Sequence, residues 1–229
     1  MVQTKRRVYC SGPLFNPEEQ WGMEAIAATL EKAGYDTFLP QRDGLEKYVM
    51  GLANDPKVTN RMFRRINKFV NRAIFSVDVY QILEGCDYLV FNMNGRVPDE
   101  GGVVETGIAF AAQKPLVIYK KDYRTKFNGS DNSMITGLSY TFSTVTSMEK
   151  IPTELERVAR ILESMGPNPY RDNNIPPHVK KVLSFGRTVW KFLSVARFFD
   201  ADDAKRLDLL DQLAAMCEES PAMARLQKA

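Results

Sequence analysis

The sequence is poor in the residues on which several protein classes depend. Its single histidine, His178, argues against a Ser-His-Asp triad and excludes a histidine-rich metal site. The three cysteines, Cys10, Cys86 and Cys217, are odd in number and show neither a disulfide nor a metal-binding spacing. We therefore expect a protein of the reducing cytoplasm that binds no metal, and whose acid–base chemistry rests on carboxylates and tyrosines.

Long apolar runs and a strong charge of one sign are also missing. No apolar stretch reaches the roughly 18 residues of a membrane-spanning helix, and residues 1–7 lead into a strand-like run without the apolar core of a signal peptide. The net charge of +3 is too small to indicate nucleic acid as a partner. With 229 residues, 44% hydrophobic and 26% charged, the chain has the composition of a globular α/β domain with an extension.

Short β-type runs alternate with helical patterns along the first 165 residues. This order predicts a doubly wound, mainly parallel, five-stranded sheet of the flavodoxin or Rossmann type, with helices on both faces. Ligands of such sheets bind beyond the carboxyl ends of the strands, so the loops after Cys10, Phe91 and Tyr119 are the first places to look for chemistry. The expected strands are 7–10, 37–39, 88–91, 116–119 and 140–145, and the expected helices are 17–33, 58–84, 103–113 and 152–165.

The composition changes after residue 165. Residues 166–177 contain four prolines and are typical of a linker. Residues 178–229 are expected to form a C-terminal helical extension, in which a basic helix over 178–198 precedes an acidic helix over 203–217. We expect these two helices to pack on one another or on a neighbour, and residues 1–165 to form the domain that carries the chemistry.

The segment 98–107 is the most informative part of the sequence, because it joins a buried strand to a helix. Gly101 and Gly102 allow the backbone to approach a ligand closely. Glu105 falls near the first turn of the helix, where the positive dipole end stabilises a carboxylate by about 0.3–1 kcal/mol. Asp99 lies in the preceding loop, so both carboxyl groups are expected to face one cavity.

The same carboxyl groups also have a purely structural interpretation. Asp99 or Glu100 then caps the helix, and Glu105 is a surface residue. A further acid, Asp78, lies inside the predicted long helix, on a stretch that is otherwise uncharged from 73 to 83. Burying an acid on such an apolar stretch costs free energy, so an acid at this place either destabilises the helix or has a function.

Two motifs give the sequence a resemblance to a known family. Residues 9–15 read Tyr-x-x-Gly-Pro-Leu-Phe, and residues 99–107 read Asp-x-Gly-x-x-x-Glu-x-Gly before an Ala-rich helix. With Asp78 and the loop 129–135, this set resembles the nucleoside 2-deoxyribosyltransferase family, which includes transferases and related nucleoside and nucleotide N-glycosidases. The resemblance covers residues 6 to about 148. The region after 166 has no counterpart in the family core, and Asn94 stands where the family commonly has Asp.

The resemblance implies a role for each matching side chain. Glu105 matches the catalytic nucleophile, and Tyr9 matches the tyrosine that hydrogen-bonds and orients it. Asp78 and Asp99 match the acids that handle the nucleobase and its proton. No cofactor is expected.

The resemblance also implies where the substrate binds. Phe15 is expected to stack on the base, and Asn132 and Met134 match a loop that a neighbouring subunit contributes to the sugar end of the site. We therefore expect a homodimer or higher homo-oligomer with a shared active site. The full set of expected substrate-binding residues is Gly12, Phe15, Gly101, Gly102, Asn132, Ser133 and Met134.

The expected reaction is cleavage of the N-glycosidic bond of a 2′-deoxynucleoside through a covalent glutamyl-deoxyribosyl intermediate, followed by transfer of the sugar to another nucleobase. A carboxylate captures the oxocarbenium-like sugar, and a second carboxyl protonates the departing base. One alternative is a nucleoside 5′-monophosphate N-glycosidase, in which Ser130, Ser133 and Arg124 serve the phosphate. A second alternative is a non-catalytic nucleotide-binding sensor. In each case the partners are small molecules, not nucleic acid or a membrane.

Overall fold

The computed structural model describes residues 5–50, 52, 58–122, 131–168 and 175–220. The chain divides into two compact units, and each is described by itself. The first unit comprises residues 1–39 and 81–175, and the second comprises residues 40–80 and 176–229. The domain boundaries at 165 and 177 stay predictions, and most of the Pro-rich linker lies outside the described residues. Within the described residues, no helix has both the length and the apolarity of a membrane span.

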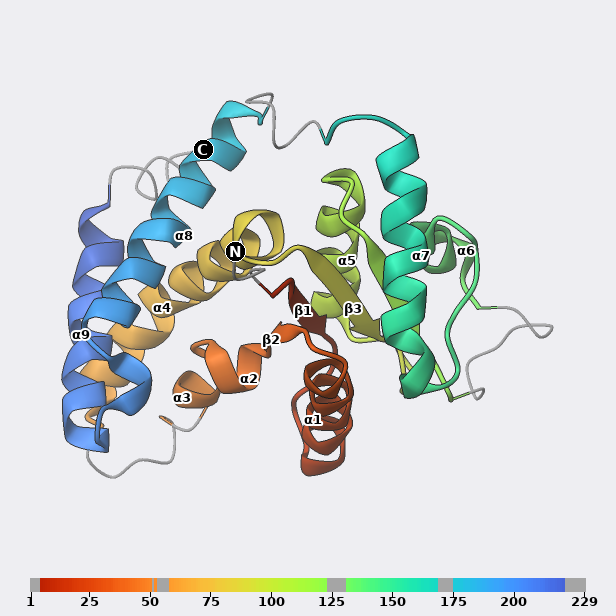
Figure 1. Cartoon of the computed structure of the whole chain (residues 1–229). Coiled ribbons are helices and arrows are strands. Elements are labelled where there is room, and N and C mark those ends of the chain that lie inside the picture. Colours follow the sequence, from red (N-terminus) through yellow and green to blue (C-terminus); the bar gives the residue numbers. More distant parts are fainter. Residues whose placement is uncertain (1–4, 51, 53–57, 123–130, 169–174, 221–229) are drawn as a thin grey trace. The chain divides into compact units, whose positions relative to one another are not determined.

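The first unit holds a parallel sheet whose strands run in the order β2-β1-β3-β4. Figure 1 labels β2, β1 and β3 of this sheet. All three strand pairings are parallel, with Tyr9 opposite Phe38 on one side and Leu89 on the other. The elements are β1 (Arg7–Ser11), α1 (Pro17–Lys32), β2 (Asp36–Phe38), η2 (Gln81–Gly85), β3 (Tyr88–Asn92), α5 (Glu100–Ala111), β4 (Leu116–Tyr119), α6 (Ser133–Thr136), η3 (Gly137–Ser139), η4 (Met148–Lys150) and α7 (Ile151–Ser164).

The strand order creates a switch point between β1 and β3. Strand β2 pairs with one edge of β1, and β3, which follows later in the chain, pairs with the other edge of β1. In open parallel sheets, ligands bind at this point, in the crevice beyond the carboxyl ends of the strands. The loops that follow Ser11 and Asn92 therefore open onto the same crevice.

Helices cover both faces of this sheet, which confirms the predicted doubly wound α/β fold. On one face, Val8 and Val90 pack with Ile26 of α1 and Leu155 of α7 in a buried core. The other face carries α5, which lies very close to β3. A Cβ atom at Gly102 would stand 2.5 Å from a ring carbon of Phe91, so only glycine permits this approach.

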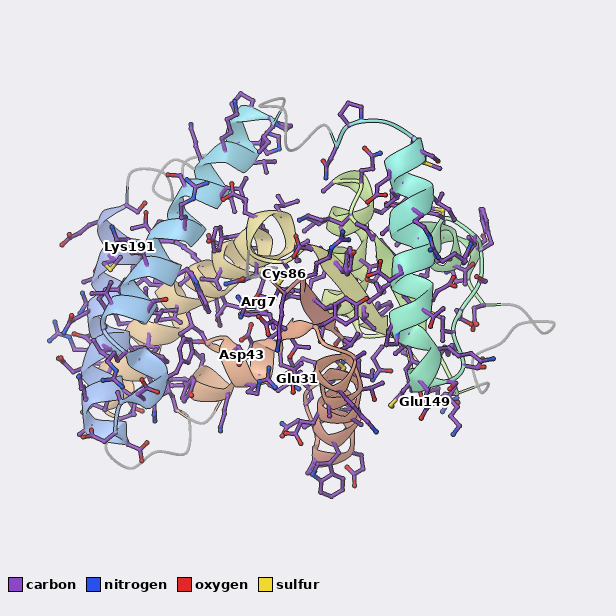
Figure 2. The ribbon with its side chains drawn as sticks, viewed as in Figure 1. Arg7, Glu31, Asp43, Cys86, Glu149 and Lys191 are labelled. Atoms are coloured by element: carbon purple, nitrogen blue, oxygen red, sulfur yellow. The ribbon has the colours of Figure 1, made fainter. Side chains whose placement is uncertain are left out.

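Arg7, labelled in Figure 2, anchors the amino end of β1. Its backbone N–H donates to Asp87 Oδ2 at 2.9 Å, and its guanidinium lies 5.2 Å from the centre of the Phe38 ring. The Tyr9 ring stacks on the same Phe38 ring with centroids 5.3 Å apart. These contacts hold β1 firmly between its two neighbours, and with it the side chain of Tyr9.

The fifth strand expected over 140–145 is reduced to a single bridge among the described residues. Val145 N–H donates to the Ile118 carbonyl at 2.8 Å, and the Val145 carbonyl accepts from Lys120 N–H at 2.9 Å. Tyr140 and Phe142 have φ values of +63° and +54°, which no extended strand tolerates. The segment therefore bends before it reaches β4.

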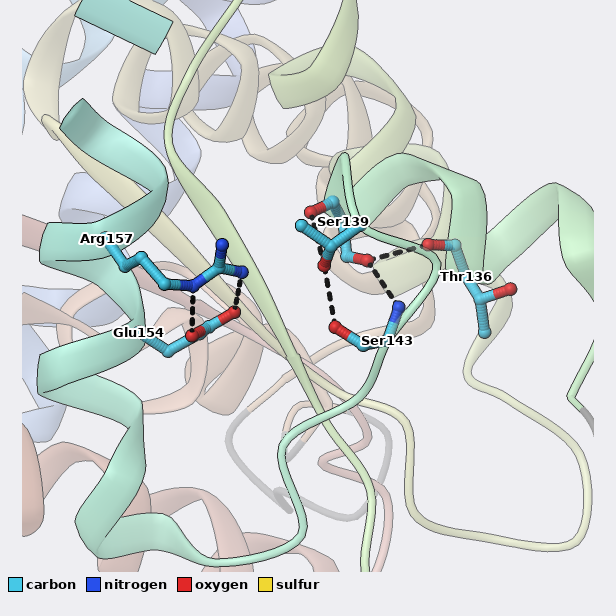
Figure 3. A network of polar contacts seen from close by, with 6 residues as sticks. Thr136, Ser139, Ser143, Glu154 and Arg157 are labelled. Atoms are coloured by element: carbon cyan, nitrogen blue, oxygen red, sulfur yellow. Dashed lines mark hydrogen bonds and ion pairs between the residues drawn. The ribbon is translucent and has the colours of Figure 1, made fainter. Parts of the chain in front are cut away.

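Hydroxyl groups stabilise this bend, as Figure 3 shows. The Ser139 hydroxyl donates to the Thr136 carbonyl at 2.7 Å and accepts from Ser143 N–H at 3.2 Å. Hydrogen bonds of this kind offer the backbone an alternative to a sheet ladder. They explain why an alternating β-type sequence does not become a full strand here.

The second unit is helical. Its described elements are α2 (Pro40–Asp43), α3 (Glu46–Met50), α4 (Asn60–Tyr80), α8 (Pro177–Val195), η5 (Phe198–Asp200) and α9 (Asp203–Glu219). Helix α4 packs against both α8 and α9. A Cβ at Gly186 of α8 would collide with the Ser76 carbonyl of α4, and Arg65 of α4 pairs with Asp211 of α9 at 2.9 Å. The long helix predicted over 58–84 is thus α4 as far as Tyr80, followed by the π-helical turn η2.

Candidate active site

Strand β1 and helix α5 bring three polar side chains together at the switch point. Residues two apart on a strand face the same side, so Tyr9 and Ser11 both point towards α5. Glu105 is the sixth residue of α5 and is half-buried. Tyr9 Oη donates to Glu105 Oε1 at 2.8 Å, and Ser11 Oγ donates to Glu105 Oε2 at 2.6 Å. Each carboxylate oxygen therefore has its own hydroxyl donor.

Both donors are rigid. Tyr9 and Ser11 are fully buried, and the Tyr9 ring is stacked on Phe38. Helix α5 is fixed at its start, because Asp99 Oδ2 accepts from Gly102 N–H at 2.6 Å as an N-cap. The geometry around Glu105 is thus set by packed elements, which is what a preorganised site requires.

Burial governs the ionisation of Glu105. The loss of hydration raises the pKa of this carboxyl to about 7, the hydrogen bonds from Ser11 and Tyr9 oppose the rise, and the negative charge of Asp99 adds to it. The helix dipole is strongest in the first turn, and Glu105 lies beyond it. The expected dipole-stabilised carboxylate is therefore replaced by a carboxyl that exchanges its proton near neutral pH, a property common at functional sites.

The two aspartates predicted to handle the nucleobase lie in different units. Asp99 is part of the Glu105 cluster and caps α5, as the structural interpretation of the sequence proposed for it. Asp78 is half-buried on α4, which belongs to the second unit. Their roles towards a nucleobase stay predictions.

The three glycines predicted to bind substrate differ in whether the backbone conformation and the surrounding space would allow a side chain. Gly12 has a φ of +151°, and a Cβ there would lie 2.8 Å from both the Cβ of Asn92 and the sulfur of Met23. Gly102 is required for the packing of α5 on the sheet. Gly101 is exposed, and a Cβ there would lie 3.4 Å from Asp99 Oδ2, an ordinary contact distance. Phe15, the expected stacking surface, is 74% exposed.

The residues expected at the sugar end of the site lie at the start of the short helix α6. No hydrogen bond among the described residues links them to Glu105. Asn132 caps α6 by accepting Met134 N–H at 2.9 Å. Asn132, Ser133 and Met134 are all exposed, Met134 to 78%. The buried ion pair between Lys120 and Asp131, 2.6 Å long, holds the segment just before them. The phosphate-binding candidates Ser130 and Arg124 lie outside the described residues.

Ser11 is the site residue that sequence reasoning missed. The signal was present in the sequence, because Ser11 stands two positions after Tyr9 on the same strand and must share its face. Nothing in the local pattern shows that its hydroxyl meets Glu105, which lies 94 residues further along the chain.

A hollow of about 640 Å³ lies elsewhere in the first unit, lined among others by Arg6, Asp87 and Pro115. These residues stand at the amino ends of β1, β3 and β4. Parallel sheets bind ligands at the opposite edge, where the Glu105 cluster lies. We therefore place the candidate site at the cluster and not at this hollow.

Comparison with known proteins gives one family match. A family model described as "Nucleoside 2-deoxyribosyltransferase" matches residues 8–138, which is more than half of the chain and includes Tyr9, Glu105 and Met134. A crystal structure of a conserved protein from Enterococcus faecalis V583 is 19% identical, with a TM-score of 0.49, and the match covers 67% of this chain and 99% of that one. No curated protein matches the chain.

Proposed function

Because the chain belongs to the nucleoside 2-deoxyribosyltransferase family, we propose that it cleaves the N-glycosidic bond of 2′-deoxynucleosides and transfers the sugar to another nucleobase. The observation that carries the proposal is the Glu105 carboxyl, which is held by two buried hydroxyls at the switch point of the sheet. Such a group has the fixed position and the tunable charge that a nucleophile needs.

In the first half-reaction, an oxygen of ionised Glu105 attacks C1′ of the deoxyribose from the face opposite the base. The C1′–N bond breaks through an oxocarbenium-like state, and its electron pair passes to the base nitrogen. Asp99 or Asp78 supplies the proton that neutralises the departing base. The products are the free base and a glutamyl-deoxyribosyl ester.

In the second half-reaction, a nitrogen of another base attacks C1′ of the ester. The C1′–O bond breaks, Glu105 leaves as a carboxylate, and the incoming base gives its proton back to the aspartate. Two attacks on C1′ from opposite faces restore the original anomeric configuration. If water takes the place of the second base, the outcome is hydrolysis.

A product assay with matched substrates tests this function. The protein is incubated with each 2′-deoxynucleoside and a different free base, and with each 2′-deoxynucleoside 5′-monophosphate alone, and the products are separated by chromatography. We expect the exchanged nucleoside to form faster than free base is released by water.

Two results would contradict the proposal. Release of base from the 5′-monophosphates, with a kcat/KM about tenfold or more above that for nucleosides, would identify a nucleotide N-glycosidase, since about 1.4 kcal/mol would then favour the phosphate. Binding without turnover of any substrate would identify a nucleotide-binding sensor.

We propose further that a second copy of the chain completes the active site. Met134 of α6 and Phe142 are 78% and 71% exposed, and the Phe142 ring lies close to Gly137, the residue that ends α6. Exposed apolar groups that lie together mark interaction surfaces. A partner subunit that covers this surface would bring Asn132 and Met134 to the sugar end of its neighbour's site, and the C-terminal helical extension would add to the interface.

Mixing two inactive variants tests the shared site. Glu105→Ala lacks the nucleophile, and Asn132→Ser lacks the amide but keeps an oxygen that can cap α6. In an equal mixture of exchanging dimers, about a quarter of the sites would regain both residues, so we expect about a quarter of wild-type activity. A monomer by light scattering, or a mixture as inactive as its components, would contradict the shared site.

The proposed location is the cytoplasm. The cysteines at positions 10, 86 and 217 are buried, and none of them forms a disulfide in the described part of the chain. Cysteines without disulfides are typical of a reducing compartment.

A further inference from the structure

We propose that Ser11 is a second positioning residue for Glu105, one that holds Oε2 while Tyr9 holds Oε1. The inference rests on the proposed function, in which Glu105 is the nucleophile. It adds to that function a residue that decides how the carboxylate is oriented and how readily it leaves the sugar.

The hydrogen-bond geometry favours Glu105 as the partner of the Ser11 hydroxyl. Ser11 Oγ lies 2.6 Å from Glu105 Oε2 and 3.4 Å from the Gly102 carbonyl. A hydroxyl has one proton to donate, and a short bond to a charged oxygen is roughly twice as strong as one between neutral groups. Because Ser11 is fully buried at the end of β1, water does not compete for this proton.

Two donors fix the carboxylate more firmly than one. The terminal torsion of a glutamate side chain is broad, so a single bond to Oε1 leaves the plane of the carboxylate free to turn about that oxygen. A second bond to Oε2, from a different residue of the same strand, removes this freedom. The lone pair that attacks the sugar then keeps one direction, as a near-attack geometry requires.

The Ser11 bond also affects the breakdown of the intermediate. A hydroxyl donates more strongly to a carboxylate than to a neutral ester oxygen. Ser11 therefore stabilises Glu105 after it has left the sugar more than while it is esterified. Without Ser11, we expect a longer-lived glutamyl-deoxyribosyl ester. We also expect a more basic Glu105, because burial raises the pKa of this carboxyl to about 7 and the Ser11 bond opposes that rise.

The chain offers a matched control for the variant Ser11→Ala. Thr106 is also fully buried, lies next to Glu105 in the sequence, and donates its hydroxyl to the Gly102 carbonyl at 2.6 Å. Thr106→Val removes a buried hydroxyl from the same packing environment without touching the Glu105 carboxylate. An effect that arises only from disturbed packing of α5 would appear in both variants.

The experiment combines a titration with kinetics on the full chain. The Glu105 carboxyl is followed by carbon NMR in glutamate-labelled protein, and its signal is assigned by its loss in Glu105→Gln. For Ser11→Ala we expect the midpoint to rise by about one pH unit, and for Thr106→Val by less than about a third of that. The acid limb of the pH profile of kcat should shift upwards by the same amount as the midpoint. As a result, kcat at pH 6 should fall about tenfold, while KM changes little. At about pH 9, where Glu105 is mostly ionised in both proteins, mass spectrometry should show more glycosylated Ser11→Ala than glycosylated wild-type protein at steady state.

The titration tests the role of Ser11 and the kinetics test the proposed function, so each can be contradicted without the other. An unchanged midpoint in Ser11→Ala, or an equal shift in Thr106→Val, overturns the role of Ser11. If the wild-type protein cleaves no deoxynucleoside or deoxynucleotide, the proposed function falls, and the NMR midpoints still decide whether Ser11 holds the carboxylate. A shifted midpoint with an unchanged acid limb of kcat overturns the claim that this contact matters for turnover.

Discussion

Glu105→Gln is expected to lower kcat for deoxyribosyl transfer by about three orders of magnitude or more, which corresponds to about 4 kcal/mol of barrier. The amide has almost the same shape as the carboxyl, but it cannot ionise and cannot form the glycosyl ester. The matched control is Glu100→Gln on the exposed first turn of the same helix, which should stay within about threefold of wild type. Activity of Glu105→Gln within about tenfold of wild type would remove Glu105 as the nucleophile.

The same variant is expected to be more stable than wild type at alkaline pH. The pKa of Glu105 in the folded protein, about 7, lies above the ordinary value of 4.5, so the folded state binds the proton more tightly than the unfolded state. The wild type therefore loses stability as pH rises from about 4.5 to 7, and Gln has no proton to lose. Between pH 5 and pH 8, the free energy of unfolding of the variant should rise relative to wild type by about 2–3 kcal/mol.

Urea unfolding at the two pH values measures this difference and also shows that the inactive variant is folded. A constant stability difference between wild type and Glu105→Gln at both pH values would mean that burial does not penalise the charge of Glu105.

The second large effect is expected from Asp99→Asn and Asp78→Asn. With natural deoxynucleosides, the loss of the group that protonates the base should lower kcat about 10²- to 10⁴-fold. With a nitrophenyl deoxyriboside, whose leaving group needs no proton, the loss should be about tenfold or less. The comparison of the two substrates isolates the proton transfer from every other role of the residue.

Asp99→Asn is especially informative, because asparagine caps helices as well as aspartate does. The bond from Gly102 N–H to Asp99 Oδ2 can therefore be replaced, and α5 should keep its start. Circular dichroism and the unfolding midpoint check that it does. Equal losses on the two substrates would assign Asp99 to capping alone, and would leave Asp78 as the remaining acid.

Much of the first unit could be predicted from the sequence. The strands around Val8, Val90 and Val117 are short apolar runs between helical patterns, and this local order is enough to predict a parallel, doubly wound sheet. The motif around Glu105 indicated the site through its resemblance to a family, and the family is confirmed. Local propensity was misleading at 140–145, where side-chain hydroxyls and two left-handed residues turn a β-type sequence into a bend.

The contacts of the site could be predicted only in part. The pairing of Tyr9 with Glu105 spans 96 residues and was expected from the resemblance, whereas the contact with Ser11 was not expected at all. The helix dipole suggested an easily ionised Glu105, yet its pKa is raised. The dipole follows from the position of a residue in its own helix, but hydration depends on every element packed around the side chain.

The sequence by itself therefore determined the properties that neighbouring residues create: the alternation of strands and helices, and a helix that begins near Asp99 or Glu100. Only the tertiary structure decided that residues 40–80 group with 176–229, that Ser11 shares Glu105 with Tyr9, and that this carboxyl holds its proton to about pH 7. The physical reason is that the burial and the long-range hydrogen bonds of a side chain depend on segments that lie far apart in the chain. No local sequence pattern contains this information.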